Sequence, residues 1–195
     1  RRQRLAVAHI EAERELEART ANVVWRDVDA LRSDLLIDAH RALYGRLPED
    51  DRRSPEGIAI APGSVRVDDV TVGRHDAPAH GSIRAFFGRM DDTYPKLRGV
   101  DSLLCGIAAA HHRFAWVHPF VDGNGRACRL QTHCALFPLN EGLWSVNRGL
   151  ARDRDGYYLH LANADQPRQG DIDRRGNLSE RMLREWCEYF VAVCK

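Results

Sequence analysis

Residues 118–129 read HPFVDGNGRACR and carry most of the chemically informative side chains of this chain. Glycines stand on both sides of Asn124, and glycine lets the backbone turn freely and lets a ligand approach its N–H groups. A helix is predicted to follow over about 126–136, and the start of a helix offers unpaired N–H donors and a partial positive charge. Gly123, Asn124 and Gly125 therefore indicate a nest for a phosphate group.

Charged side chains surround this nest. Arg126 and Arg129 are three residues apart on the predicted helix and share a face, so their two guanidinium groups suit a polyphosphate. Asp122 lies at the mouth of the nest, where a carboxylate beside phosphates is explained by Mg²⁺ between them. His118 ends the preceding helix, titrates near neutral pH and can take a proton from a hydroxyl group. These groups together indicate transfer of a phosphorylated group.

The rest of the chain predicts a mostly α-helical domain. Apolar residues recur every three or four positions, which is typical of amphipathic helices. The second helix has an apolar stripe that runs from Val24 and Val28 to Leu43, and Gly45 is expected to end it. Asp101 is expected to cap the helix that reaches Trp116. The expected helices cover about 4–19, 24–44, 82–94, 101–116, 126–136, 154–164 and 179–194. The first of them is highly charged and is expected to be exposed.

One short segment reads as strand. Residues 48–63 hold three prolines and two glycines among many charges and are expected to form a loop. Valines at 65 and 67, and again at 70 and 72, flank Asp68-Asp69, which predicts a small β-hairpin with its turn at the two aspartates. Such a hairpin is stable only when it packs on helices. The predicted fold class is therefore mostly α with one small β-hairpin.

Composition limits the classes of function. The 195 residues suffice for one domain with a core, and 29 Lys+Arg against 28 Asp+Glu give no electrostatic case for nucleic acid or an anionic membrane as partner. Five cysteines without a Cys-x-x-Cys pair argue against a disulfide framework or a zinc ribbon. No apolar run reaches the ~18 residues that a membrane span requires, and a cytoplasmic location is expected.

Two adjacent histidines raise the question of a metal site. His111 and His112 are consecutive in a predicted helix, where neighbouring side chains point in different directions, so they are poor co-ligands. They are expected to be structural or exposed.

Residues 118–129 resemble the signature of the Fic family, H-x-F-x-[DE]-G-N-G-R-x-x-R, and fill every fixed position of it. Segments 70–75, 148–152 and 175–179 also resemble Fic sequences, and the likeness extends from about 24 to 194. The resemblance implies a Fic-type helical core with a small β-hairpin flap. The expected organisation is an N-terminal helical extension over 1–23 and a Fic domain over 24–195.

The resemblance implies a protein adenylyltransferase, which moves AMP from MgATP to a Ser, Thr or Tyr hydroxyl of a target protein. His118 would be the general base, Asp122 would bind the Mg²⁺ that bridges the α- and β-phosphates, and Phe120 would anchor the loop in the core. Asn124 would contact the α-phosphate. The nucleotide-binding residues implied by the family are Gly123, Asn124, Gly125, Arg126 and Arg129, together with one of Tyr157 and Tyr158 in the adenine pocket. The flap that would pair with the main chain of the target includes Val70, Thr71, Val72 and Gly73.

Several alternatives stay open at this point. The same family includes enzymes that remove AMP or that transfer another phosphorylated group, and the phosphate-transferring relatives alter the Gly-Asn-Gly-Arg segment that is intact here. A non-catalytic nucleotide-binding module would be favoured by loss of His118 or Asp122, and both are present. The sequence leaves open the target, an oligomeric state and delivery into another cell.

Many Fic proteins carry an inhibitory helix with the pattern [ST]-x-x-x-E-[GN], whose glutamate pairs with the second arginine of the signature. Here Glu56 and Glu141 precede glycine, but Arg52 and Phe137 stand four residues before them, so these 195 residues lack the pattern. We therefore expect Arg129 to lack that partner. A brake on activity would come from a separate small protein or from a segment preceding the first residue.

Overall fold

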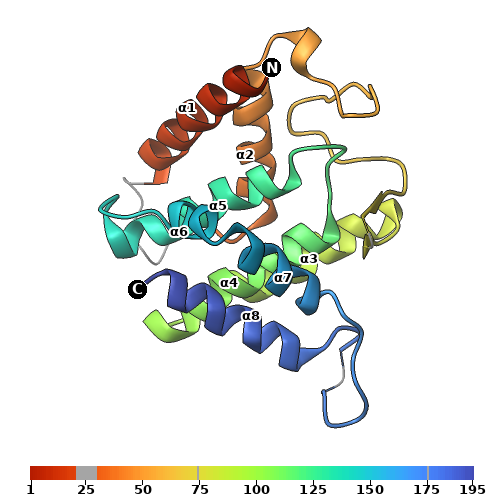
Figure 1. Cartoon of the computed structure of the whole chain (residues 1–195), viewed down its shortest axis with the longest axis vertical. Coiled ribbons are helices and arrows are strands. Elements are labelled where there is room, and N and C mark those ends of the chain that lie inside the picture. The colour runs from red at the N-terminus through yellow and green to blue at the C-terminus, as the bar shows by residue number, and fades with distance from the viewer. Residues whose placement is uncertain (21–29, 74, 175) are drawn as a thin grey trace.

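The computed structural model describes residues 1–20, 30–73, 75–174 and 176–195, and Figure 1 shows their arrangement. Helix α5 lies in the middle, with α1 and α2 on one side and α4, followed by α8, on the other. The remaining helices α3, α6 and α7 flank this stack. The helices are α1 (Arg2–Thr20), α2 (Ser33–Gly45), α3 (Ile83–Thr93), α4 (Val100–Val117), α5 (Asn124–Asn140), α6 (Val146–Arg152), α7 (Arg154–Ala164) and α8 (Glu180–Val193).

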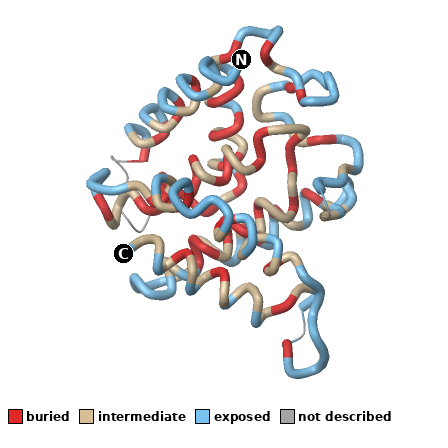
Figure 2. Tube along the Cα trace, in the orientation of Figure 1, coloured by how far each residue is buried: buried red, intermediate tan, exposed pale blue. Residues whose placement is uncertain are grey.

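The core is built around α5. Its buried residues include every position from Leu130 to Leu136 and so lie on nearly every side of the helix, because α1, α2 and α4 all pack against it. Figure 2 shows the buried stretches of the chain in red. Ala127, Leu130 and Cys134 are at most 1% exposed. The 118–129 segment therefore leads into the most enclosed helix of the described structure, and that enclosure fixes the loop in front of it.

The helical predictions are confirmed with changes at several ends. The helix predicted over 24–44 begins only at Ser33 in the described residues, because residues 30–32 form a turn. The helix over 154–164 is observed as predicted, and the one over 179–194 is observed as α8, whose start is capped by the Ser179 side chain. Gly45 is the last residue of α2 and so ends this helix as expected, but it does not adopt the left-handed conformation of a C-terminal glycine cap. Asp101 lies inside the first turn of α4, which begins after Gly99 at φ 81, so the predicted Asp101 cap is also wrong.

Helix α1 is less exposed than its charge suggested. Ala8, Ala12 and Leu16 are buried against α2 and α5 and belong to the same core. Val24, Val28 and the predicted boundary between residues 23 and 24 lie outside the described residues. No helix among the described residues is long and apolar enough to span a bilayer.

The hairpin prediction is wrong in position. The two strands are β1 (Thr71–Val72) and β2 (His75–Asp76), which pair antiparallel, and Gly73 adopts the left-handed φ of 63° in the turn between them. The segment before them is held elsewhere, because the buried Arg66 side chain donates to the carbonyl groups of Asp68 and His118 at 2.7 and 2.8 Å. That attachment prevents pairing across Asp68-Asp69.

Candidate functional site

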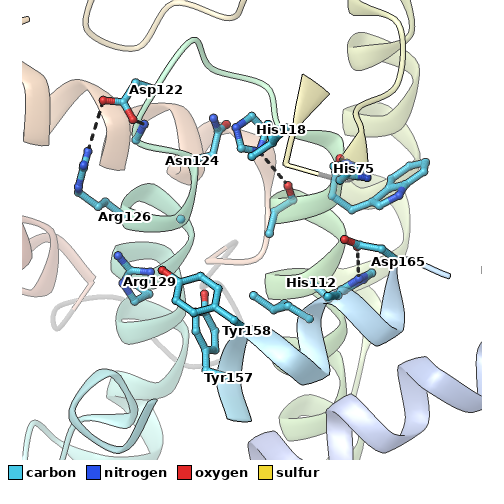
Figure 3. A pocket seen from close by; sticks show the side chains of 17 residues that line it. His75, His112, His118, Asp122, Asn124, Arg126, Arg129, Tyr157, Tyr158 and Asp165 are labelled. Carbon is cyan, nitrogen blue, oxygen red and sulfur yellow. Dashed lines mark hydrogen bonds and ion pairs between the residues drawn. The ribbon is translucent and has the colours of Figure 1, made fainter. Parts of the chain in front are cut away.

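The loop between α4 and α5 begins at a strained residue. His118 follows the last turn of α4 in the left-handed conformation, with φ 50° and ψ 59°, which costs a non-glycine residue about 1 kcal/mol or more. Two hydrogen bonds hold it there, since its N–H donates to the Phe114 carbonyl at 3.2 Å and its carbonyl accepts from Arg66. The strain turns the imidazole toward the start of α5 (Figure 3).

The protonation of His118 follows from its contacts. Its Nδ1 faces the Ala115 carbonyl at 3.3 Å and must donate to it, so the proton of the neutral ring lies on Nδ1 and Nε2 keeps its lone pair. Burial lowers the pKa of His118 to about 4, against the opposing hydrogen bond to Ala115. The ring is therefore neutral at pH 7, with Nε2 free to accept a proton.

The phosphate nest predicted at the start of α5 has the required backbone. Gly123 precedes the helix at φ 84°, and a Cβ there would lie 2.5 Å from the Tyr44 ring, so only glycine fits. Gly123 supplies no side-chain cap, which leaves the first-turn N–H groups of Asn124, Gly125 and Arg126 for a ligand. These N–H groups line the same cavity as His118.

The Asn124 side chain has a different task in this structure. Its amide nitrogen donates to the Phe120 carbonyl and its oxygen accepts from the Phe120 N–H, both at 2.8 Å. This pair of bonds closes the loop on itself, while the Phe120 ring is fully buried and anchors it, as predicted. Both polar groups of the Asn124 amide are therefore already bonded within the loop. The expected contact between the Asn124 side chain and an α-phosphate stays a prediction.

Helix α2 supports the loop from the opposite side. His40 stacks on the Phe120 ring with centroids 3.9 Å apart, accepts from the Gly63 N–H at Nδ1 and therefore donates from Nε2 to the Asp122 carbonyl at 3.1 Å. One turn later, the Tyr44 hydroxyl donates to Asp122 Oδ2 at 2.9 Å. Neither residue was identified from the sequence, although their spacing of four places both on one helix face.

Asp122 fits the Mg²⁺ that the family implies. Its carboxylate lines the cavity, is 21% exposed and faces the cationic side chains of Arg1 and Arg126 at 3.7 and 3.9 Å. Mg²⁺ in nucleotide sites is commonly held by one or two carboxylates together with phosphates and water. A single carboxylate at this place satisfies that pattern, and no group of three metal-ligating side chains occurs among the described residues.

Arg129 is held by a directed chain of hydrogen bonds. The Thr132 hydroxyl donates to the Cys128 carbonyl at 2.7 Å, so it must accept from His111 Nδ1, also at 2.7 Å. Burial lowers the pKa of His111 to about 3 and keeps the ring neutral, so its Nε2 accepts from the Tyr157 hydroxyl at 3.0 Å. The Tyr157 hydroxyl therefore donates its hydrogen bond to His111, and its oxygen accepts the side-chain hydrogen bond from Arg129.

The two tyrosines differ in position, because Tyr157 supports Arg129 from inside the protein through this chain of hydrogen bonds. Tyr157 is 5% exposed, whereas Tyr158 is 53% exposed, and both line the cavity. No carboxylate of the described residues lies within 4.0 Å of Arg129, which agrees with the missing inhibitory pattern. His111 is thus structural, as expected, and fully enclosed.

These groups surround one cavity of about 430 Å³, drawn in Figure 3. His118, Asp122 and the start of α5 form one wall, and Tyr158 stands opposite. His112 lies deeper and donates from Nε2 to Asp165 at 2.9 Å, since its Nδ1 accepts from Arg113. Of the predicted flap residues, Val72 reaches the cavity; Val70, Thr71 and Gly73 do not line it.

The opposite edge of the hairpin contributes His75. Its Nε2 donates to the Trp116 carbonyl at 2.6 Å, which ties β2 to the end of α4. His75 and the buried Arg66 were not singled out as site residues by the sequence reading, because isolated His and Arg residues in a loop give no periodic signal. All five cysteines are free thiols, as expected.

Known proteins resemble this chain in sequence. The Fic/DOC family model matches residues 30–136. Proteins named protein adenylyltransferase Fic from Drosophila willistoni, Drosophila virilis and Drosophila mojavensis are 29%, 28% and 28% identical over 140 residues. The match covers 70% of this chain in each case but 24%, 25% and 24% of the fly proteins, so the chain spans about a quarter of the length of these relatives.

Solved structures resemble the whole fold. A Fic family protein from Desulfovibrio desulfuricans G20 superposes with a TM-score of 0.58 at 21% identity, over 95% of this chain and 52% of that one. A Fic domain containing signaling protein from Bacteroides thetaiotaomicron VPI-5482 gives a TM-score of 0.57 at 15% identity, over 98% and 66%. At such identities the likeness concerns the fold. Because the family model covers more than half of the sequence, this chain belongs to the Fic/DOC family.

Proposed function

We propose that this chain is a protein adenylyltransferase, which transfers AMP from MgATP to a Ser, Thr or Tyr hydroxyl of a target protein. One observation carries the proposal: a neutral imidazole with a free Nε2, unpaired N–H groups at the start of a helix and two arginines line the same cavity. The names of the fly relatives support transfer of an adenylyl group.

The residues divide the reaction between them. His118 Nε2 accepts the hydroxyl proton while the hydroxyl oxygen forms a bond to the α-phosphorus. The bond between the α-phosphorus and the oxygen bridging to the β-phosphate breaks, and pyrophosphate leaves with the electron pair. The N–H groups of Asn124, Gly125 and Arg126 stabilise the charge that develops on the α-phosphate oxygens. Arg126 and Arg129 hold the outer phosphates.

Mg²⁺, held by Asp122 when bound, neutralises part of the phosphate charge. The tyrosine Tyr44 keeps the carboxylate oriented, because its hydroxyl donates to Asp122 and accepts from Arg126 at 3.0 Å. The negative phosphates raise the pKa of His118 from its low value in the free protein, which strengthens the base where it is needed.

The hairpin is suited to hold the target. Thr71 and Val72 are exposed, and within the described residues β1 and β2 pair with each other alone, so an extended segment can add to them by main-chain hydrogen bonds. Val72 and His75 line the cavity beside His118, which brings such a segment next to the base.

The reaction is tested by supplying MgATP labelled either at the α-phosphate or at the γ-phosphate to the chain and a cell lysate. We expect the α-label, and not the γ-label, on protein, with a mass gain of one AMP on a hydroxyl side chain. The His118→Ala variant serves as the control. Transfer of the γ-label, or release of AMP from a modified target without any transfer, would contradict the proposal.

A further inference from the structure

A second cavity of about 580 Å³ opens beside the nucleotide cavity. The two share Arg126, Arg129, Tyr157 and Tyr158, so they meet at the signature arginines. Its outer walls are the first turns of α1 on one side and α6 with the start of α7 on the other. We refer to this second cavity as the α1 chamber.

Three of the four arginines that line the α1 chamber have no ion-pair partner among the described residues, whereas Arg126 lies 3.9 Å from Asp122. Arg2, Arg129 and Arg154 line it, and none of the three has a carboxylate within 4.0 Å among the described residues. The described lining contains no Asp or Glu. Two other arginines of α1 do have carboxylate partners, since Arg4 lies 2.5 Å from Asp51 and Arg19 lies 2.8 Å from Asp38.

The chain carries a net charge of only +1, so several unpaired cations around one cavity form a local feature that attracts an anion. His9, which also lines the chamber, reports the same positive potential: its pKa is lowered to about 4, first by burial and then by Arg129 and Arg126. Leu5 and Leu150 make part of the wall apolar, which weakens the screening of charges inside.

The connection between the cavities indicates which anion fits. A nucleotide whose α-phosphate occupies the start of α5 extends its remaining phosphates past Arg126 and Arg129. The α1 chamber begins at those two arginines and continues to Arg154, whose guanidinium carbon lies 5.6 Å from the centroid of the Tyr158 ring. The path is thus cationic from the nest to the chamber.

We propose that the α1 chamber is a subsite for the terminal phosphates of nucleoside polyphosphates, held by Arg154 and Arg2 beyond the two signature arginines. The proposal rests on the proposed function in placing the α-phosphate at the start of α5. It makes triphosphates and tetraphosphates the preferred nucleotides of this site, and it gives the departing pyrophosphate a place to be bound.

The test is calorimetric binding of ADP, ATP, adenosine 5′-tetraphosphate and inorganic tripolyphosphate to the full chain, with a His118→Ala background to prevent turnover. We expect affinity to rise in the order ADP, ATP, tetraphosphate. Arg154→Gln and Arg2→Gln should each weaken tetraphosphate and tripolyphosphate binding by up to about fivefold, the effect of losing one partly exposed charge contact, and change ADP binding by less than about twofold. Arg154→Lys should restore part of the loss.

The matched control is Arg152→Gln, because Arg152 is an exposed arginine of α6 that lines neither cavity. Equal affinity for ADP and tetraphosphate in the parent background, or equal effects of Arg154→Gln and Arg152→Gln, would overturn the subsite. Because binding is measured without transfer, the subsite and the proposed function are tested independently of each other. A chain that shows this arginine dependence but never transfers AMP keeps the subsite and loses the proposed function.

Discussion

Replacing Tyr157 with phenylalanine should loosen Arg129 without disturbing the core. The Tyr157 ring is 5% exposed and packs beside the rings of His111 and Trp186, contacts that phenylalanine retains. The change removes one hydroxyl. That hydroxyl donates to His111 Nε2 at 3.0 Å and is the acceptor available to Arg129.

The cost has two parts. In the variant, His111 Nε2 is a buried acceptor without a donor, which typically costs ~1–3 kcal/mol. Protonation does not relieve this at neutral pH, because burial keeps the pKa of His111 at about 3. For a chain of this size we expect the melting temperature to fall by about 2–4 °C for each kcal/mol lost.

The second part concerns nucleotide binding. Arg129 loses the acceptor that orients it, and one hydrogen bond to a charged group contributes about 1 kcal/mol or more, which is roughly a fivefold change in affinity. Since Arg129 is assigned to the outer phosphates, Tyr157→Phe should weaken ATP binding more than ADP binding.

The neighbouring tyrosine provides the control. Tyr158 is 53% exposed, so Tyr158→Phe should leave stability nearly unchanged. Denaturant titration gives the stability of both variants, and calorimetry gives their ATP and ADP affinities. If both variants are equally stable, and both retain the parent ratio of ATP to ADP affinity, the proposed bond chain does not position Arg129.

Four further outcomes are expected. His118→Ala should lower AMP transfer by about 10²–10⁴ and leave ATP affinity within about twofold, since the ring is assigned to proton removal. Asp122→Ala should abolish the enhancement of ATP binding by Mg²⁺, measured by calorimetry with and without the metal. Lowering the pH from 7 to 5 should destabilise the fold, because His40 and His111 have folded pKa values of about 4 and 3, below the unfolded value of about 6.5, so the unfolded chain binds more protons in this range. Supplied with MgATP, the isolated chain should modify itself or a target, because Arg129 lacks a carboxylate partner in the described structure.

Each of these outcomes can be contradicted. Full transfer by His118→Ala, or an unchanged Mg²⁺ effect in Asp122→Ala, would remove the assigned role. The loss of stability between pH 7 and pH 5 should be smaller in a His40→Gln variant than in the parent chain. If the parent chain is equally stable at pH 7 and pH 5, the two histidines are not buried in the neutral form. Very low activity of the isolated chain, restored by replacing some other Asp or Glu, would indicate an internal brake.

Much of the fold was predictable because amphipathic helices produce a periodic apolar pattern in the local sequence. The apolar spacing in 154–164 and 179–194 led to helices that the structure contains, since side chains three or four apart share a face whatever the tertiary context. The hairpin was misplaced because alternation in a short segment cannot distinguish strand pairing from an extended segment tied down by Arg66. The ends of α2 and α4 depended on backbone conformations that residue type alone does not decide.

The sequence by itself determined the chemistry that one contiguous segment can carry. His118, Asp122, Arg126 and Arg129 lie within twelve residues, so the helix start and its spacing place them together without reference to the rest of the chain. Family membership follows from the same residues.

Tertiary structure alone decided how those groups are held and what adjoins them. His40 and Tyr44 reach Asp122 from α2, about eighty positions earlier in the chain, and Tyr157 reaches His111 from α7. The α1 chamber brings Arg2 and Arg154, which are far apart in the sequence, to one cavity. Such contacts depend on how the helices pack, and that packing is set by the whole core. The spacing of residues within one segment therefore does not predict which distant side chain will contact a given loop.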